Sequence, residues 1–267
     1  MKKIPFAALL ALTGVGLVAQ TAHAGTTSYA SNGDDLFLGF RQDGNSTADI
    51  LIDLGQASLY RGGFSTVIGS QNGIIGTGLG ALLTSSFGSG WFTDPTVHWG
   101  LTATSGGLSQ TAGGVTEFPN TLYISNPESN SNIPTSQINA TQSTATSAIL
   151  TMEGQWVGLA TSTGLLNGRV ETPSSTSWAG SASNQFNDAT QFGNFEDNPN
   201  ASSALDLYRL TRSSNTSSSD GLRGTFTINS SGQVTYSAAV PEPTAISLLG
   251  GAGLLLLVRR RRNPAVA

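Results

Sequence analysis

The chain has 267 residues, of which 38% are hydrophobic and only 10% charged, with 33 glycines and no cysteine. Residues 25–240 contain no lysine, and their 6 arginines against 15 carboxylates give a net charge near −9. A surface this acidic repels phosphates and anionic lipid headgroups, which argues against nucleic-acid binding. Without cysteine there are no disulfides, so stability must come from core burial or bound ions.

The first 24 residues have the pattern of a secretory signal peptide. Two lysines precede an apolar run over residues 4–19, and Ala22 and Ala24 occupy the two positions that a signal peptidase inspects. An uncleaved anchor is the alternative, but the run is short and is interrupted by proline and glycine. We therefore expect signal peptidase to cut after Ala24 and to release an exported body.

Residues 25–239 predict a single β-rich domain. Short apolar clusters are bounded by Gly, Asn, Asp and Ser, which is typical of strands joined by turns. The candidate strands lie at residues 35–40, 49–54, 97–102, 121–125, 156–160 and 205–210. The first two flank a polar turn and predict an opening hairpin.

The clearest strand pattern stands near the end of this domain. Phe226 and Ile228 alternate with threonines, and Val234 and Tyr236 alternate with hydroxyl residues, so one face is apolar and the other polar. Pairing Ile228 with Val234 leaves a three-residue loop in which Gly232 takes the left-handed position. We expect a closing hairpin here.

Two segments have apolar residues at helical spacing, 80–87 and 136–150, although the second is rich in Thr and Ser. The polar stretches 171–203 and 213–220 predict loops. No internal repeat of fixed period is visible, which argues against a β-helix or a propeller. The fold we expect is therefore mainly β, an antiparallel β-sandwich or jelly-roll-like single domain with one or two short helices.

The exported body offers few groups for catalysis. It has no cysteine or lysine, and His98 is its one histidine. Asp94, His98 and a serine could form a triad, but no Gly-x-Ser-x-Gly elbow surrounds a serine, and a strand histidine beside Trp99 explains the residues more simply. A zinc site usually needs several His or Cys ligands. We therefore expect that the exported body is not an enzyme.

The sequence leaves two alternative functions open, glycan hydrolysis and carbohydrate binding. A glycan hydrolase needs two carboxylates roughly 5 to 10 Å apart, and no spacing in the sequence pairs any of the five available glutamates. These are Glu117, Glu128, Glu153, Glu171 and Glu196. Carbohydrate binding would use tryptophan platforms, whereas tryptophans in a β protein more often anchor the core. The candidates are Trp91, Trp99, Trp156 and Trp178.

Calcium is the candidate ion. Asp43, Asn45, Thr47 and Asp49 place oxygen atoms at alternate positions, as the first half of an EF-hand loop does. The glycine and the closing glutamate of that loop are missing, and a turn between two strands explains the same residues. A second oxygen-rich stretch at residues 194–198 has the same two interpretations.

The last 28 residues have three parts in a fixed order. Pro241, Glu242 and Pro243 come first, followed by a run without charge over residues 245–258 and then by four arginines, Arg259, Arg260, Arg261 and Arg262. Fourteen helical residues span about 21 Å, less than a hydrocarbon core of about 30 Å, and arginine side chains can extend that reach by snorkelling. The arginines predict a C-terminal transmembrane helix with its charged flank inside.

This order resembles the sorting tail of PEP-CTERM proteins, which a membrane enzyme called exosortase processes. The resemblance implies that Pro241, Glu242 and Pro243 form the recognition element, that residues 245–258 enter the membrane and that the arginines stop transfer. It also implies a membrane-anchored intermediate that ends on the cell surface or in the extracellular polymer matrix of biofilm-forming bacteria. For the body we expect a non-enzymatic structural or adhesive role, with contact to extracellular polysaccharide as a further option.

Overall fold

The computed structural model describes residues 35–45, 47–61, 65–67, 78–107, 109–112, 115–131, 133–135, 139–158, 168–175, 177–181, 195–212 and 221–239. The signal peptide with Ala22 and Ala24, the Pro241-Glu242-Pro243 motif, the apolar run and the four arginines lie outside these residues. Among the helices that the structure does describe, none has the length and apolar character to cross a membrane.

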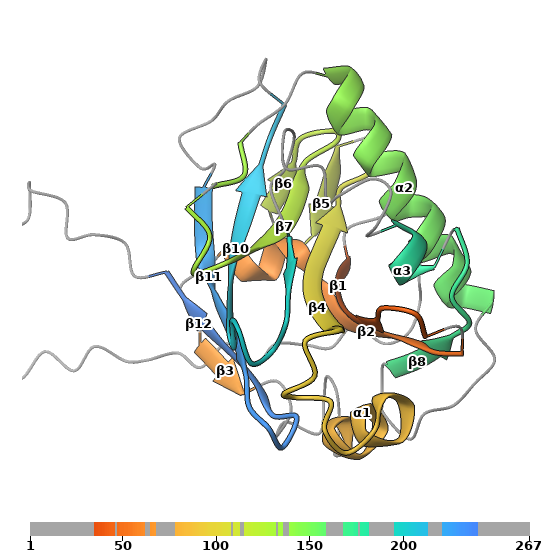
Figure 1. Cartoon of the computed structure of the whole chain (residues 1–267). Coiled ribbons are helices and arrows are strands. Elements are labelled where there is room, and N and C mark those ends of the chain that lie inside the picture. Colours follow the sequence, from red (N-terminus) through yellow and green to blue (C-terminus); the bar gives the residue numbers. More distant parts are fainter. Residues whose placement is uncertain are drawn as a thin grey trace, which may run out of the picture.

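Strands dominate the chain (Figure 1). The strands are β1 (Asp35–Gln42), β2 (Asp49–Gln56), β3 (Ser65–Val67), β4 (Val97–Thr104), β5 (Gln110–Ala112), β6 (Val115–Glu117), β7 (Leu122–Pro127), β8 (Gly168–Glu171), β9 (Glu196–Asp197), β10 (Ala204–Leu210), β11 (Gly221–Ile228) and β12 (Val234–Ala238). The helices are η1 (Ala57–Arg61), a 3-10 turn, α1 (Leu79–Phe87), α2 (Asn139–Gly158) and α3 (Trp178–Ser181).

One antiparallel sheet organises the domain. Its strands follow the order β3-β12-β11-β10-β7-β4-β1-β2-β8, and β9 adds a short pairing to β4. The sheet curls into a half-barrel (Figure 1). Strands β3 and β8 are its two edges, while β5 and β6 form a separate two-stranded sheet.

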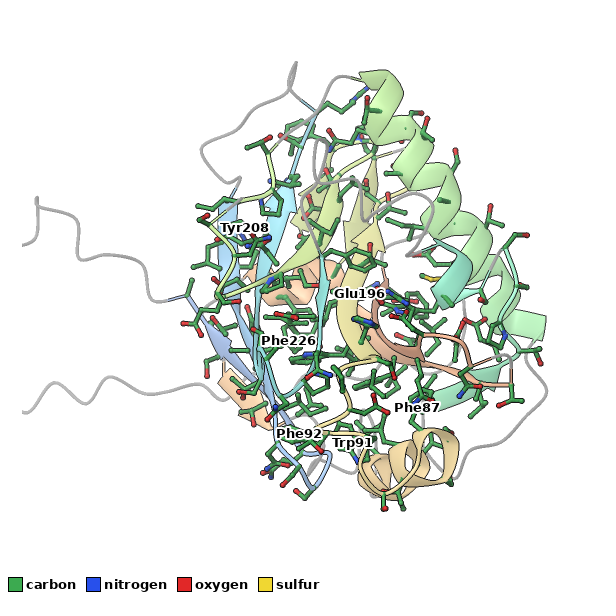
Figure 2. All side chains as sticks on the ribbon, viewed as in Figure 1. Phe87, Trp91, Phe92, Glu196, Tyr208 and Phe226 are labelled. Carbon is green, nitrogen blue, oxygen red and sulfur yellow. The ribbon has the colours of Figure 1, made fainter. Side chains whose placement is uncertain are left out.

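The inner face of the curl holds the larger core. Side chains from β1, such as Phe40, and from β12, such as Tyr236, belong to the same cluster although four strands separate them in the sheet. Tyr60 of η1, directly after β2, contacts Phe226 of β11 and accepts a hydrogen bond from the Tyr236 hydroxyl at 3.0 Å, so distant parts of the sheet meet across this face. Phe87, the last residue of α1, lies with Trp91 and Phe92 at one end of the curl (Figure 2).

In the described part of the chain, helices cover part of the outer face of the sheet. Helices α2 and α3 contact β4, β1 and β2, and a second core cluster lies beneath them. The covered strand β1 is therefore buried on both faces, whereas in β11 buried and more exposed positions alternate. This difference explains why β11 carries threonines between its apolar residues and β1 does not.

Most of the predicted elements are confirmed. The mainly β, antiparallel class holds, and the opening hairpin pairs Phe40 with Ile50. In the closing hairpin Ile228 pairs with Val234, and Gly232 has a φ of 77°. The helix expected at 80–87 is α1.

Three expectations differ from the structure. The long strands join one curled sheet and not the two facing sheets of a sandwich or jelly roll, because β4 pairs with both β1 and β7. The second helix is long, and Trp156, expected in a strand, lies in α2. The stretch expected as a loop at 171–203 contains α3 and β9. Alternation shows that a strand face is buried but not which element covers it.

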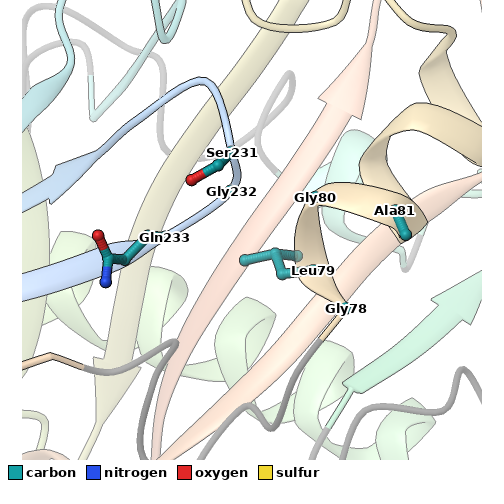
Figure 3. A pocket seen from close by; sticks show the side chains of 7 residues that line it. All are labelled: Gly78, Leu79, Gly80, Ala81, Ser231, Gly232 and Gln233. Carbon is teal, nitrogen blue, oxygen red and sulfur yellow. The ribbon is translucent and has the colours of Figure 1, made fainter.

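The closing hairpin rests directly on the first turn of α1 (Figure 3). A hollow of about 310 Å³ lies between them, lined by residues 78–81 and 231–233. At the closest approach, a Cβ atom on Gly80 would lie 2.2 Å from the carbonyl oxygen of Ser231. A glycine at this position is therefore required for the backbones to meet.

We expect Gly80→Ala to lower the free energy of unfolding by about 1–3 kcal/mol, because the new methyl group meets rigid backbone. Chemical denaturation of the purified domain measures this. The neighbouring exposed residue gives the control, since Ala81→Ser is expected to change stability by about 0.5 kcal/mol or less. Equal effects of the two substitutions would contradict the close contact.

Candidate functional site: a buried carboxylate cluster

Trp178 packs flat against the outer face of the sheet where two glycines open a slot. Gly39 of β1 and Gly100 of β4 are register partners. A Cβ atom on Gly39 would lie 2.0 Å from Cδ2 of Trp178, and one on Gly100 would lie 2.9 Å from Cγ of Glu196. Glycine in the interior of a strand often marks such a close approach. The pair therefore positions Trp178 and Glu196 over the sheet.

Three carboxylates surround this tryptophan. The indole Nε1 donates to Oε1 of Glu196 at 2.6 Å, and the backbone N–H of Trp178 donates to Oε1 of Glu171 at 2.6 Å. Oδ2 of Asp49 accepts from the Ser177 hydroxyl at 2.8 Å and from the backbone N–H of Ala179 at 2.9 Å. Asp49, Glu171 and Glu196 are 1%, 4% and 6% exposed. We call these three residues the carboxylate cluster.

The cluster continues to the protein surface through ion pairs. Nε of Arg41 donates to Oε2 of Glu196 at 2.8 Å, and the same guanidinium pairs with Asp43. Nε2 of His98 lies 3.0 Å from Oδ2 of Asp43, whose side chain is 57% exposed. Arg41 and His98 are register partners on β1 and β4, which brings them to the same edge of the cluster.

Burial shifts two of these acids in the same direction. It raises the pKa of Asp49 to about 6, against the opposing effect of the hydrogen bonds from Ala179 and Ser177. Burial, against the opposing hydrogen bond from the Trp178 N–H and with the help of the nearby charge of Asp49, raises the pKa of Glu171 to about 7. Near neutral pH this region therefore takes up and releases protons.

These shifts predict that stability falls as pH rises. A folded-state pKa above the ordinary value means that the folded protein binds more protons than the unfolded chain between about pH 4 and 7. Each such carboxyl contributes up to about 1.4 kcal/mol per pH unit in that window. Denaturant titrations at pH 4.5 and 7.5 should give the smaller free energy of unfolding at pH 7.5. The lowered pKa values of Asp43 and Asp94 act below about pH 4, outside the window.

A matched pair of variants tests this pH dependence. Glu171→Gln keeps an oxygen that accepts from Trp178 but cannot titrate, so the slope between the two pH values should shrink. Glu128→Gln alters an exposed glutamate and should leave the slope unchanged. If the free energy of unfolding of the wild type instead rises from pH 4.5 to pH 7.5, groups outside the carboxylate cluster control its pH dependence.

A second buried charge group lies inside the curl. Nη2 and Nε of Arg209 donate to Oε2 of Glu117 at 2.6 and 2.9 Å, and the Tyr123 hydroxyl donates to Oε1 at 2.6 Å. Both charged residues are fully buried. These hydrogen bonds satisfy both oxygens of the Glu117 carboxylate. They also join β6, which carries Glu117, to β7 and β10.

The four calcium candidates stand in separate hydrogen-bond sets. Asp43 pairs with Arg41 and His98, whereas Asp49 points to α3. Oδ1 of Asn45 accepts from the Thr47 hydroxyl at 2.7 Å and from two backbone N–H groups, which is the geometry of a polar turn. The structure therefore does not gather these oxygens at one point. Within the described ranges, no group of three or more His, Asp or Glu is arranged to hold a metal ion.

The candidates for a catalytic triad and for sugar binding make contacts within the fold. His98 faces Asp43, while Asp94 accepts from the Thr96 hydroxyl at 2.6 Å and from Gln42. Three of the four tryptophans are core residues in the structure, namely Trp91, Trp99 and Trp178. Their burial agrees with the role of core anchor and leaves no face of these three open to a sugar ring.

Sequence reasoning missed the cluster itself. It left the five glutamates unpaired, whereas Glu171 and Glu196 both bond to Trp178 and lie 25 residues apart in a stretch expected to be a loop. The available signal was the pair of glycines inside two predicted strands, since each marks a place where another group approaches the backbone.

Comparisons of the chain with protein-family models, with curated proteins and with solved structures give no match.

Proposed function

We propose that this chain is an exported protein sorted to the cell surface or extracellular polymer matrix, where its β-rich body has a non-enzymatic, structural or adhesive role. The observation that carries the proposal is the paired signals in the sequence. A signal-peptide pattern ends at Ala24, and Pro241-Glu242-Pro243, an apolar run and four arginines follow the body. The partners implied are signal peptidase, an exosortase-type enzyme and the membrane.

The geometry of the body supports the proposal that its role is non-enzymatic. Glu117, Glu171 and Glu196 are buried and accept hydrogen bonds from named internal donors, and none of the three faces an open cleft in the described part of the chain. Their contacts join strands and the covering helix to one another. A glycan hydrolase would instead present two carboxylates to its substrate.

The experiment that tests sorting is intact mass spectrometry of the protein recovered from the cell surface. The wild-type strain should yield a chain that starts after Ala24 and lacks the segment beyond the Pro241-Glu242-Pro243 region. A strain without the sorting enzyme should retain that segment. An intact tail ending at Ala267 in both strains would make the chain a membrane-anchored protein and would overturn the sorting proposal.

Two tail variants sharpen this experiment. Replacing Pro241, Glu242 and Pro243 by alanine should leave the tail uncut in the wild-type strain, because the recognition element is gone. Pro264→Ala, beyond the arginines, is the matched control and should be processed normally. Processing of both variants would show that the sorting enzyme does not recognise the Pro241-Glu242-Pro243 motif.

The role of the body needs a separate measurement. An adhesive or structural body should release no reducing sugar from extracellular polysaccharide. Saturable binding of a glycan or of calcium would favour a binding module, and release of reducing sugar would establish a hydrolase and overturn the non-enzymatic role.

A further inference from the structure

The segment from β8 to α3 lies at one edge of the sheet, and we call its described residues, 168–175 and 177–181, the strap. Among the described strands, β8 is an edge strand and pairs with β2 through four register pairs. Helix α3 is held by the carboxylate cluster, to which it donates the N–H groups of Trp178 and Ala179. The strap can therefore detach from the sheet without breaking the pairing between any of the other strands.

Negative charge gathers beneath the strap from several elements. Asp49 of β2 and Glu171 of β8 are register partners, and Glu196 of β9 reaches the same tryptophan. Arg41 of β1 forms one ion pair with Glu196 and another with Asp43, which in turn faces His98 of β4.

Two more charged residues belong to the neighbouring elements. Glu153 is buried on α2, which packs against α3, and Arg169 is the register partner of Leu51 on β2. Ionisation of Asp49 and Glu171 thus adds two negative charges to a water-poor site where Arg41 already divides its bonds between Glu196 and Asp43.

We propose that the strap is a pH-sensitive latch, which closes on the sheet when Asp49 and Glu171 are protonated and opens when both are ionised, while the remaining sheet stays folded. A protonated carboxyl still offers an oxygen to the N–H groups of α3, so these bonds persist without buried charge. Ionisation adds two negative charges near Glu196, whose own charge disfavours the ionised form of Asp49. The raised pKa values of both acids put the change between about pH 5 and 8.

Opening of the latch has a defined structural result. It frees the edge of β2 for pairing and withdraws Trp178 from the slot over Gly39 and Gly100. Trp178 belongs to the outer cluster, whereas Val170 of β8 packs against the edge of the inner cluster, so opening uncovers mainly the outer face. The latch therefore controls one edge and one patch of the outer face.

Hydrogen exchange of the full chain, followed by mass spectrometry at pH 5 and pH 8, tests the latch. Rates are corrected for the intrinsic pH dependence of exchange. Opening of peptides from the strap should be at least tenfold more frequent at pH 8, since a single carboxyl can change an equilibrium tenfold per pH unit. Peptides from β10 should show no such change. Equal strap protection at both pH values, or opening of strap and β10 together, would overturn the proposal.

Amide variants separate titration from packing. The double variant Asp49→Asn/Glu171→Gln keeps acceptor oxygens and should protect the strap equally at pH 5 and pH 8. Glu128→Gln, an exposed control, should retain the wild-type response. If the double variant does not fold, Glu171→Gln alone should reduce the difference between the two pH values. An unchanged response in either folded cluster variant would show that other groups control the strap.

Discussion

Gly39→Ala is expected to lower the free energy of unfolding by about 3 kcal/mol, at the upper end for an overpacked site. The added methyl carbon would lie 2.0 to 2.4 Å from three atoms of the Trp178 indole, which cannot yield by rotating a flexible end. The whole ring must move, and its hydrogen bond to Glu196 is lost with it. Denaturant unfolding followed by circular dichroism measures the change.

Two comparisons show whether the clash with Trp178 is the cause. Gly90→Ala places a methyl group where no atom lies within 4 Å, so it should change stability by about 0.5 kcal/mol or less. Trp178→Ala alone should cost about 3–5 kcal/mol through the cavity it leaves. Adding Gly39→Ala to Trp178→Ala should then cost little, because the clash is gone. Additive effects of the two substitutions would contradict the proposed contact.

The glycine also shows how far a sequence pattern reaches. Its position inside a predicted strand was clear, and the short apolar clusters bounded by turn residues correctly placed β1, β2, β4, β7 and β10. A glycine in a strand indicates that some group comes close, but it does not identify that group. Trp178 is 139 positions away, in a stretch whose Ser and Asn content predicts a loop.

Local patterns predicted local structure better than tertiary structure. The closing hairpin was predicted to the register because its alternation, loop length and Gly232 all constrain the same few residues. The choice between a sandwich and one curled sheet depends instead on the pairing of β4 with β1 and β7, which no local spacing encodes. In α2, tertiary packing overcame the low helix propensity of its threonines and serines.

The carboxylate cluster escaped prediction for a related reason. Asp49 could be assigned to a turn or a calcium loop from its neighbours in sequence, but its partners Ser177 and Ala179 lie more than 125 positions away. Its raised pKa follows from burial under the strap, which is a property of the folded chain alone. A carboxylate at the start of a strand has no sequence mark that distinguishes this role.

The other large effect is expected at the buried ion pair inside the curl. Arg209→Met should lower the free energy of unfolding by about 3–5 kcal/mol, because it leaves the Glu117 carboxylate buried without its cation. Tyr123→Phe removes one donor to the same carboxylate and should cost about 1.5–3 kcal/mol. Thermal or denaturant unfolding near pH 7 measures both. Arg223→Met, at a half-buried arginine that donates to the Gly221 carbonyl, is the control and should cost less than either.

A compensating variant tests whether an unpaired charge, and not lost packing, sets this cost. In Arg209→Met/Glu117→Leu both charges are absent, so the double variant should recover most of the stability lost in Arg209→Met. The Tyr123 hydroxyl then lacks its acceptor, and adding Tyr123→Phe should recover a further part. If Arg209→Met/Glu117→Leu is as unstable as Arg209→Met, the arginine stabilises the curl by filling space between β6, β7 and β10, and the charge of Glu117 is secondary.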